Sequence, residues 1–282
     1  IIGAGAIGVE FASFYNTLGA KVTLVEVMDQ ILPAEDAEIA DLAKQSFVNQ
    51  GMEVLTGTGV EEVKVTGKSL TALIGGKNQK FDAAILSVGV SGNIEELGLE
   101  AIGVEVDRGF ISVDEYQQTS VDGVYAIGDV AGVPCLAHKA SHEGIIAVEG
   151  IVGEMPHPLN KERIPGCTYS HPQVASIGLS EAQAGERGEI KVGRFPLLAN
   201  GKAVAVNDTE GLVKTIFDAS TGALLGAHMI GPGVTEMIQG FAVAIGLETT
   251  ESELMETIFP HPTLSEAMHE SVLSAYGRTI NF

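Results

Sequence analysis

The chain opens with Ile1-Ile2-Gly3-Ala4-Gly5-Ala6-Ile7-Gly8, in which three glycines have the spacing Gly-x-Gly-x-x-Gly. Between a strand and a helix, this spacing is the dinucleotide-binding fingerprint. Gly3 makes the tight turn, Gly5 lets the backbone approach a pyrophosphate, and Gly8 lets helix and strand pack closely. The phosphates of such a ligand bind the free N–H groups at the N-terminus of the helix. A glycine-rich turn without a ligand is the alternative, because the spacing alone is a weak signal.

A second feature strengthens this interpretation. The segment Lys21 to Glu26 is predicted to form the second strand, and it ends in an acid 18 residues after Gly8. A carboxylate at this place can bind both hydroxyls of a ribose. The glycine turn and Glu26 together predict a site for NAD. Because a domain rarely begins inside its own first strand, we also expect a further segment upstream of Ile1.

Composition indicates a folded protein of about two domains. The chain has 282 residues, 45% of them hydrophobic, and 35 glycines, as expected of a turn-rich α/β protein. No apolar run approaches the roughly 18 residues of a membrane span. The formal net charge of −21 argues against nucleic acid and against membranes as partners. A solvated acidic surface is the simplest explanation of this charge, and attraction of a basic protein partner is the alternative.

The two cysteines, Cys135 and Cys167, lie 32 positions apart, which is not the spacing of a metal site. We therefore expect buried free thiols and no bound metal. So few cysteines suit a reducing compartment, the cytoplasm or alternatively the mitochondrial matrix.

The predicted elements divide the chain into three parts. Residues 1–92 form a Rossmann-type α/β NAD-binding domain that ends in an antiparallel ribbon with strands at 60–66, 69–74 and 80–88. Residues 93–159 form a central segment, in which an apolar strand ends at Gly128-Asp129 and a helix follows over 136–151. Residues 160–282 form an α+β domain, because strands come first and helices follow.

One segment near the C-terminus, Phe259 to Glu266, carries candidate catalytic residues. Pro262 suits the first position of a helix, which places His261 just before that helix and Glu266 one turn inside it. Side chains on a helix tilt toward its N-terminus, so Glu266 is predicted to contact the imidazole. Such a carboxylate fixes the tautomer and leaves the other ring nitrogen free to take a proton. The alternative is an acid favoured by the helix dipole beside an unrelated histidine.

Several segments together resemble the flavin-dependent pyridine nucleotide-disulfide oxidoreductases, and among these the dihydrolipoamide dehydrogenases most closely. They are GAGAIGVE, VTLVE, GVYAIGDVAG, LAHKASHEG, YSHPQVASIG, GAHMIGPGVTEMI, HPTLSEA and RTINF, which run from one end of the chain to the other. The resemblance implies that NAD is bound by Gly3, Gly5, Gly8 and Glu26. It further implies that Val60 and Gly89 contact the adenine and nicotinamide sides and that Glu10 lies by the nicotinamide.

The same resemblance implies FAD as a second cofactor. It puts Asp129 on the flavin chain and Leu136, Ala137 and His138 near the isoalloxazine ring. His261 would be the acid/base, oriented by Glu266, and would serve the active site of the partner subunit in a homodimer. The implied partners are the acyltransferase core of a 2-oxo acid dehydrogenase complex and a lipoyl domain as substrate.

Two departures from the family pattern bear on activity. The redox-active Cys-x4-Cys and the N-terminal FAD fingerprint are not found in this sequence, so we expect the chain alone to be inactive. Val90 follows Gly89 where the family often has an arginine, which puts contacts on the far side of the nucleotide in doubt. The alternatives are a sibling flavin disulfide reductase of the mercuric or glutathione type that uses NADPH, against which Glu26 argues, and a non-catalytic NAD-binding, dimerising module.

Overall fold

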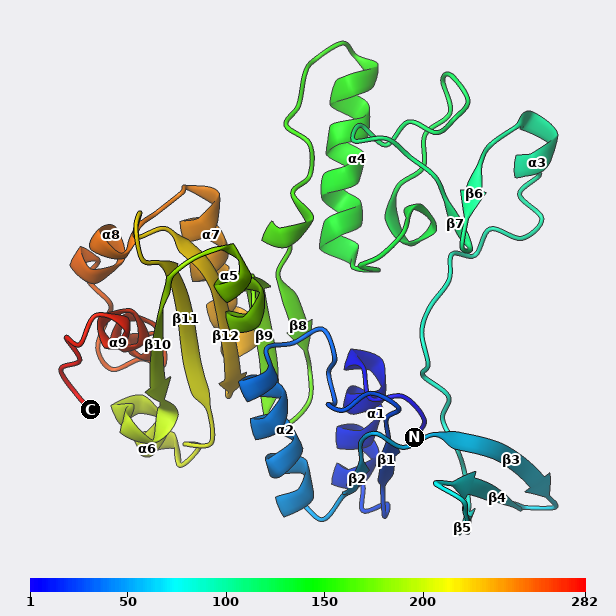
Figure 1. Ribbon diagram of the computed structural model, residues 1–282, viewed down its shortest axis with the longest axis horizontal. Coiled ribbons are helices and arrows are strands. Elements are labelled where there is room, and N and C mark those ends of the chain that lie inside the picture. The colour runs from blue at the N-terminus through cyan, green and yellow to red at the C-terminus, as the bar shows by residue number, and fades with distance from the viewer. The chain divides into compact units, whose positions relative to one another are not determined.

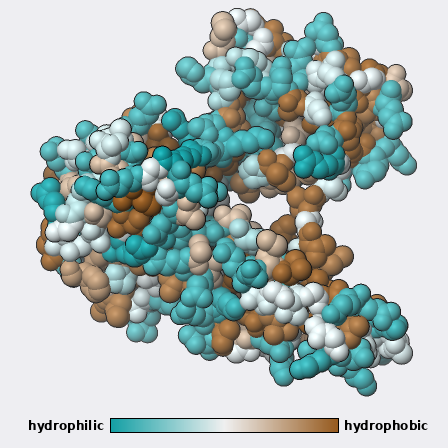
Figure 2. Space-filling view, in the orientation of Figure 1, coloured by the Kyte–Doolittle hydropathy of each residue, from teal (hydrophilic) through white to brown (hydrophobic).

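The computed structural model describes residues 1–282, which form two units. Ile1–Val88 and Glu162–Phe282 make up the first unit, and Gly89–Lys161 make up the second. The predicted division into three domains stays a prediction. Hydrophilic side chains cover much of the face seen in Figure 2, in keeping with the net charge of −21. No helix is long and apolar enough to cross a membrane.

A small parallel sheet lies at the start of the first unit (Figure 1). β1 (Thr23–Val25) pairs with β2 (Glu53–Leu55), while Ile2 bridges Val25 on one side and Leu86 on the other. The helices α1 (Ala6–Thr17) and α2 (Ala37–Asn49) pack against it, with Leu24, Ile39 and Phe47 fully buried. This is the Rossmann-type α/β arrangement that the sequence predicted. α1 begins at Ala6, before Gly8, so this glycine lies within the first turn.

An antiparallel ribbon follows, formed by β3 (Val60–Thr66), β4 (Ser69–Ile74) and β5 (Lys77–Phe81). The first two strands agree with the prediction, but the predicted single strand over 80–88 is wrong. The tight turn at Gly75-Gly76, with φ of +53° and +77°, returns the chain at once, so the third strand starts at Lys77. Leu86 instead pairs with Ile2 in the parallel sheet.

The rest of the first unit contains a five-stranded antiparallel sheet in the order β10-β11-β12-β9-β8. Its strands are β8 (Gly166–Thr168), β9 (Gln173–Gly178), β10 (Ile190–Pro196), β11 (Leu212–Asp218) and β12 (Leu224–Gly231). Its helices are α5 (Glu181–Arg187), α6 (Gly201–Val206), α7 (Val234–Gly246), α8 (Glu251–Glu256) and α9 (Glu266–Ala275). The sequence predicted neither β8 nor α5 and α6, which are too short to show a period.

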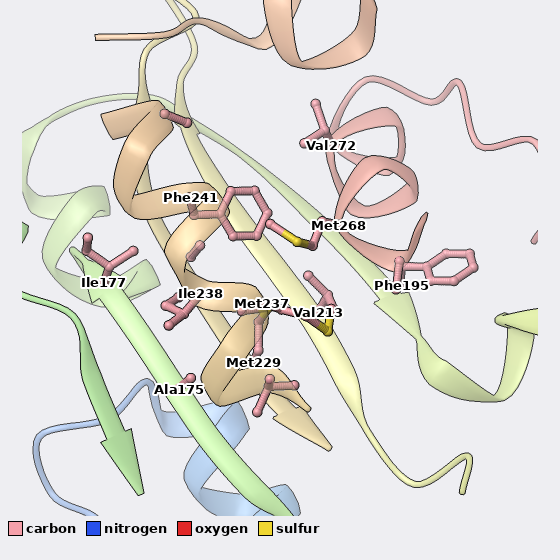
Figure 3. Close-up of a cluster of buried hydrophobic side chains, with 14 of the residues drawn as sticks. Ala175, Ile177, Phe195, Val213, Met229, Met237, Ile238, Phe241, Met268 and Val272 are labelled. Atoms are coloured by element: carbon pink, nitrogen blue, oxygen red, sulfur yellow. The ribbon is translucent and has the colours of Figure 1, made fainter. Parts of the chain in front are cut away.

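Both faces of this sheet are buried. α7 and α9 cover one face, where Phe195, Phe241 and Met268 belong to the largest apolar cluster (Figure 3). On the other face, Val174, Leu212 and Ile230 pack with side chains of α2. Successive side chains of β11 point to opposite faces of the sheet, so Val213 and Phe217 belong to the first cluster and Leu212 belongs to the second. The N-terminal and C-terminal halves of the unit therefore share a core.

A cluster of charges, in which Lys214 and Asp36 are buried and the other members are partly exposed, lies between the same two halves. Lys214 on β11 is 1% exposed, and its Nζ lies 2.7 Å from both Asp36 and Glu181 and 2.9 Å from Glu38. Asp36 also caps α2 and accepts a hydrogen bond from the N–H of Glu181. Arg194 pairs with Glu38 and Glu181 at the edge of the cluster. One buried ammonium thus ties α2, α5 and β11 together.

The second unit contains α3 (Leu99–Ile102), β6 (Val106–Asp107), β7 (Phe110–Ile111) and the long helix α4 (Ala137–Ile151), which agrees with the prediction. The prediction of an apolar strand that ends at Gly128 is wrong. Tyr125 makes only an isolated bridge to Gln118, and a 3₁₀ helix, Gly128–Ala131, begins where the strand was expected to end. Gly128 has φ +76°, which turns the chain out of the extended conformation.

Replacing Lys214 by Met should destabilise the protein by about 3–5 kcal/mol, because the carboxylates around it lose their buried partner. Denaturant unfolding at pH 7 measures this change. Lys77→Met, at an exposed position on β5, is the control and should change stability by no more than about 0.5 kcal/mol. Similar values for the two variants would contradict the account of the cluster.

The same cluster predicts a pH dependence. Burial alone would raise the pKa of Asp36, but the hydrogen bonds and charge of Lys214 and the Glu181 N–H bring this pKa below its ordinary value. A carboxyl with a lowered pKa stabilises the fold above its unfolded pKa, and this stability is lost as the pH falls through the folded pKa. The stability difference between the native chain and Lys214→Met should therefore shrink below about pH 4.

Candidate functional site

Two of the three glycines in the opening turn are required by packing. Gly3 has φ +94°, and a Cβ built on it would lie 2.3 Å from the carbonyl oxygen of Ser87. A Cβ on Gly8 would lie 1.9 Å from the carbonyl oxygen of Gly3. A Cβ on Gly5, in contrast, would meet nothing within 4 Å. The chain itself gives no packing reason for a glycine there, so the open space beside Gly5 fits the pyrophosphate of a dinucleotide.

The N-terminus of α1 offers hydrogen-bond donors at the same place. Gly5 is the N-cap and supplies no capping side chain, and the first helical bond is donated by the N–H of Val9 to Gly5. The N–H groups of Ala6, Ile7 and Gly8 make no hydrogen bond within the chain. Free amides at the positive end of a helix dipole suit phosphate oxygens. The turn therefore fits NAD, whose binding by Gly3, Gly5 and Gly8 stays a prediction.

Glu26 lies at the end of β1 and is 6% exposed. Its Oε2 accepts a hydrogen bond of 2.7 Å from the N–H of Ala4, inside the glycine turn, and its Oε1 accepts one of 3.0 Å from Met28. A carboxylate can accept about four hydrogen bonds, so these two leave capacity for ribose hydroxyls. A 2′-phosphate beside this buried carboxylate would instead meet a like charge.

Ser87 is a residue of this site that the sequence did not reveal. Its Oγ lies 3.0 Å from the carbonyl oxygen of Ile2 and 2.9 Å from that of Gly3, and its N–H also donates to Ile2. It thereby holds the first strand where it enters the turn. Its only signal in the sequence is its position at the end of an apolar segment, where ligands of parallel sheets bind.

The remaining predicted NAD contacts have these places. Val60 begins β3 and packs against the apolar cluster that contains Val25. Gly89 has φ +127° and open space in the direction of a side chain. Glu10 on α1 accepts a hydrogen bond of 2.8 Å from the N–H of Tyr169, so it ties α1 to the loop after β8. The nucleotide contacts of these residues stay predictions.

In the second unit, a buried ion pair holds the turn that carries Asp129. Lys139 and Glu143 lie one turn apart on α4, 3.0 Å from each other, and their side chains are 1% and 4% exposed. Lys139 donates to the carbonyl oxygens of Gly128 and Gly132, while Glu143 accepts from the N–H of Gly128. Asp129 itself is exposed on this fixed turn. The spacing of opposite charges by four residues was the one sequence signal for the pair.

Close to this turn in the sequence, α4 begins without a side-chain cap. Leu136 is its N-cap residue, and Ala137 and His138 occupy its first turn and are exposed. An exposed carboxylate followed by an uncapped helix N-terminus fits part of FAD, with its ribityl hydroxyls and polar ring edge. The flavin contacts of Asp129, Leu136, Ala137 and His138 stay predictions.

Both cysteines are free and partly exposed, so the expectation that they are buried is wrong in degree. Burial raises the pKa of both thiols, and the carboxylate of Asp129 adds to this effect at Cys135. Neither thiol has the lowered pKa of a reactive cysteine. The structure contains no cluster of three or more histidine, cysteine or acidic side chains that could hold a metal.

His261 and Glu266 form the predicted contact, but the local geometry differs from the prediction. α9 begins at Glu266 and not at Pro262. The reason is that Glu266 Oε2 accepts a 2.8 Å hydrogen bond from the N–H of Thr263, while the Thr263 hydroxyl donates to Pro260. These bonds hold the segment in a turn ahead of the helix. Glu266 Oε1 lies 2.9 Å from His261 Nδ1.

The pair is electrostatically suited to proton transfer. Burial alone would raise the pKa of Glu266, but hydrogen bonds from Thr263 and His261 lower it, so the carboxylate stays ionised near neutral pH. The His261 side chain is 77% exposed, and its Nε2 makes no hydrogen bond within the chain. One ring nitrogen is thus fixed and the other is accessible. The catalytic roles of His261 and Glu266 stay predictions.

Comparison with known proteins identifies the family. Residues 1–144 match the model of the pyridine nucleotide-disulphide oxidoreductase family, and residues 164–272 match the dimerisation domain of the same family. The chain belongs to the pyridine nucleotide-disulphide oxidoreductases. The predicted fold class, an α/β Rossmann-type domain followed by an α+β dimerisation domain, is confirmed, as is the resemblance to this family.

Among members of this family, the chain is 56% identical over its whole length to the dihydrolipoyl dehydrogenases of Zymomonas mobilis and Rhizobium etli, and 44% identical to that of Bacillus subtilis. It spans 60–62% of the length of these relatives. Among solved structures, LpdA from Mycobacterium tuberculosis has a TM-score of 0.89 at 30% identity. The flavoprotein disulfide reductase RclA from Escherichia coli has a TM-score of 0.90 at 29% identity. Each of these two matches covers 96% of this chain, and the chain spans 60% of LpdA and 63% of RclA.

The glycine turn predicts opposite results for two alanine variants. Gly5→Ala should change stability by no more than about 1 kcal/mol, the scale of an N-cap preference, yet weaken NADH binding by about 1–3 kcal/mol, because its methyl group enters the pyrophosphate space. Gly8→Ala should destabilise the fold by about 1–3 kcal/mol or more, because its Cβ overlaps the Gly3 carbonyl. Thermal unfolding and NADH fluorescence titration measure both. Unchanged NADH affinity in Gly5→Ala would contradict the site.

Proposed function

We propose that this chain is the NAD-binding and dimerising part of a dihydrolipoyl dehydrogenase, an NAD-dependent flavoprotein that oxidises protein-bound dihydrolipoamide through a disulfide and FAD. The observation that carries the proposal is the His261–Glu266 pair, in which one ring nitrogen is fixed at 2.9 Å and the other is accessible. The 56% identity to two dihydrolipoyl dehydrogenases supports it.

The reaction requires a base because the thiolate, not the thiol, attacks a disulfide. A dihydrolipoamide thiol is mostly protonated at neutral pH. His261 Nε2 would take this proton, and the carboxylate of Glu266 would stabilise the imidazolium that forms. Glu266 also fixes the ring, because its other oxygen is held by the Thr263 N–H. Bound FAD, held in part by Asp129, Leu136, Ala137 and His138, would carry electrons between the disulfide and NAD.

NAD would bind at the glycine turn, with its pyrophosphate on the N-terminus of α1 and its adenosine ribose on Glu26. Val60, Gly89 and Glu10 are the further contacts that we propose. The buried carboxylate of Glu26 supports NAD over NADP, and this distinguishes the proposal from a sibling reductase that uses NADPH. A non-catalytic NAD-binding, dimerising module would not need the His261–Glu266 pair.

We further propose a homodimer in which His261 serves the active site of the partner subunit. The match of residues 164–272 to a dimerisation domain and the exposure of His261 support this arrangement. The acyltransferase core of a 2-oxo acid dehydrogenase complex and a lipoyl domain would be its partners, and the net charge of −21 suits a basic docking module. The free thiols suit a reducing compartment such as the cytoplasm.

The chain contains no Cys-x4-Cys, so we expect it to be inactive alone, and the base is tested in an enzyme that joins it to the disulfide region of a relative. His261→Ala should slow the half-reaction with dihydrolipoamide by about 10²- to 10⁴-fold, the usual cost of losing a general base. Oxidation of the reduced enzyme by NAD should change far less, because that step does not use this base.

Stopped-flow measurement of each half-reaction decides the matter, with Glu266→Gln expected to lie between the native enzyme and His261→Ala. If both half-reactions slow equally, or if neither slows, His261 is a structural residue and the proposed mechanism is wrong.

A further inference from the structure

A buried amide lies behind the turn that carries His261. Asn200 follows β10 and is 4% exposed. Its Oδ1 accepts a hydrogen bond of 2.9 Å from the N–H of Ala203 and so caps α6. Its Nδ2 donates a hydrogen bond of 3.1 Å to the carbonyl oxygen of Thr263. Because one partner can only donate and the other can only accept, the two bonds fix the orientation of the amide.

From Asn200, hydrogen bonds run continuously to the imidazole. The backbone of Thr263 is held at its carbonyl oxygen by Asn200 and at its N–H by Glu266 Oε2, at 2.8 Å. The other oxygen of Glu266 lies 2.9 Å from His261 Nδ1, and an ionised carboxylate can only accept a hydrogen bond there. Every link joins groups whose donor and acceptor roles are complementary. If Thr263 moved away from Asn200, its N–H would move too, and the contact between Glu266 and His261 would therefore shift.

Burial decreases along this series. Asn200 is 4% exposed, the Glu266 side chain 25% and the His261 side chain 77%. Within one chain the exposed imidazole has little packing of its own to choose one ring orientation, so its orientation there depends on Glu266. The position of Glu266 depends in turn on a backbone that is anchored to a buried group. Sequence separation hid this link, because Asn200 lies 63 residues before Thr263.

We propose that Asn200 is a positioning residue for His261: through Thr263 and Glu266 it holds the imidazole as the Nδ1–H tautomer, with Nε2 free to accept a proton. This inference rests on the proposed function of His261 as a base. It assigns Asn200 no contact with substrate or cofactor.

Two variants separate this role from the helix cap. Asn200→Ser and Asn200→Asp both keep an oxygen that can cap α6. The serine side chain is too short to reach Thr263. The aspartate carboxylate has no N–H to donate to the carbonyl oxygen of Thr263. Ser180→Ala is the matched control, because it removes the side-chain cap of α5, which is not part of the His261 turn.

The readout is the tautomer of neutral His261, measured by ¹⁵N–¹H NMR of the imidazoles in the chain of 282 residues. The ratio of Nδ1–H to Nε2–H should fall by about fivefold in both Asn200 variants, the equilibrium factor of one ordinary hydrogen bond. It should not change in Ser180→Ala. A change in stability alone cannot produce this pattern, because the control loses a cap as well.

An unchanged tautomer ratio in either Asn200 variant would overturn the positioning role. The same variants, placed in the enzyme with the disulfide region, should slow the dihydrolipoamide half-reaction and leave oxidation by NAD unchanged. If His261→Ala does not slow that half-reaction, the proposed function fails, whatever Asn200 does to the tautomer. If His261→Ala slows it and the Asn200 variants do not, only the positioning role fails.

Discussion

The close approach of the first turn of α1 to the first strand is the constraint on which the candidate NAD site depends. A methyl group on Gly8 would lie 1.9 Å from the Gly3 carbonyl oxygen, so only glycine allows this contact. The contact aims the N-terminus of α1 at the carboxyl ends of the parallel strands. Glu26 and Ser87 lie at two of these ends and bind the turn by hydrogen bonds. The result is a set of free N–H groups beside a fixed carboxylate.

The charge cluster around the buried Lys214 connects this site to the rest of its unit. Ion pairs in a protein interior need good geometry to offset the loss of hydration. Here three carboxylates lie within 2.9 Å of one ammonium, and they come from α2 and α5 while the lysine comes from β11. α2, the helix that follows the strand ending at Glu26, is thereby fixed to one face of the five-stranded sheet. α9 packs on the other face of this sheet. Glu266, the first residue of α9, and the glycine turn thus belong to one unit.

The parts of the site that the sequence predicted are local. The glycine turn and Glu26 lie within one βαβ segment, and the His261–Glu266 contact spans five residues, so pattern and spacing were sufficient. The start of α9 was predicted wrongly because Pro262 suits a helix, whereas side-chain bonds of Thr263 and Glu266 favour a turn. The residues that the sequence did not reveal have roles that depend on partners distant in the chain. Ser87 contacts Ile2, Asn200 contacts Thr263, and Lys214 contacts Asp36. Lys139 and Glu143 escaped for another reason, since charged residues on a helix are ordinarily assigned to its solvated face.

The central claim is that the glycine turn and Glu26 form a site for NAD, and amide NMR of this chain during titration with NADH and then NADPH tests it most directly. We expect NADH to shift the amide resonances of Ala6, Ile7 and Gly8, because these N–H groups would bind the pyrophosphate. NADPH should need a higher concentration, and Glu26→Ala should narrow that difference by about 1–3 kcal/mol, the scale of a charged hydrogen bond. Unshifted resonances at these three amides, or equal affinity for both nucleotides in the native chain, would contradict the account.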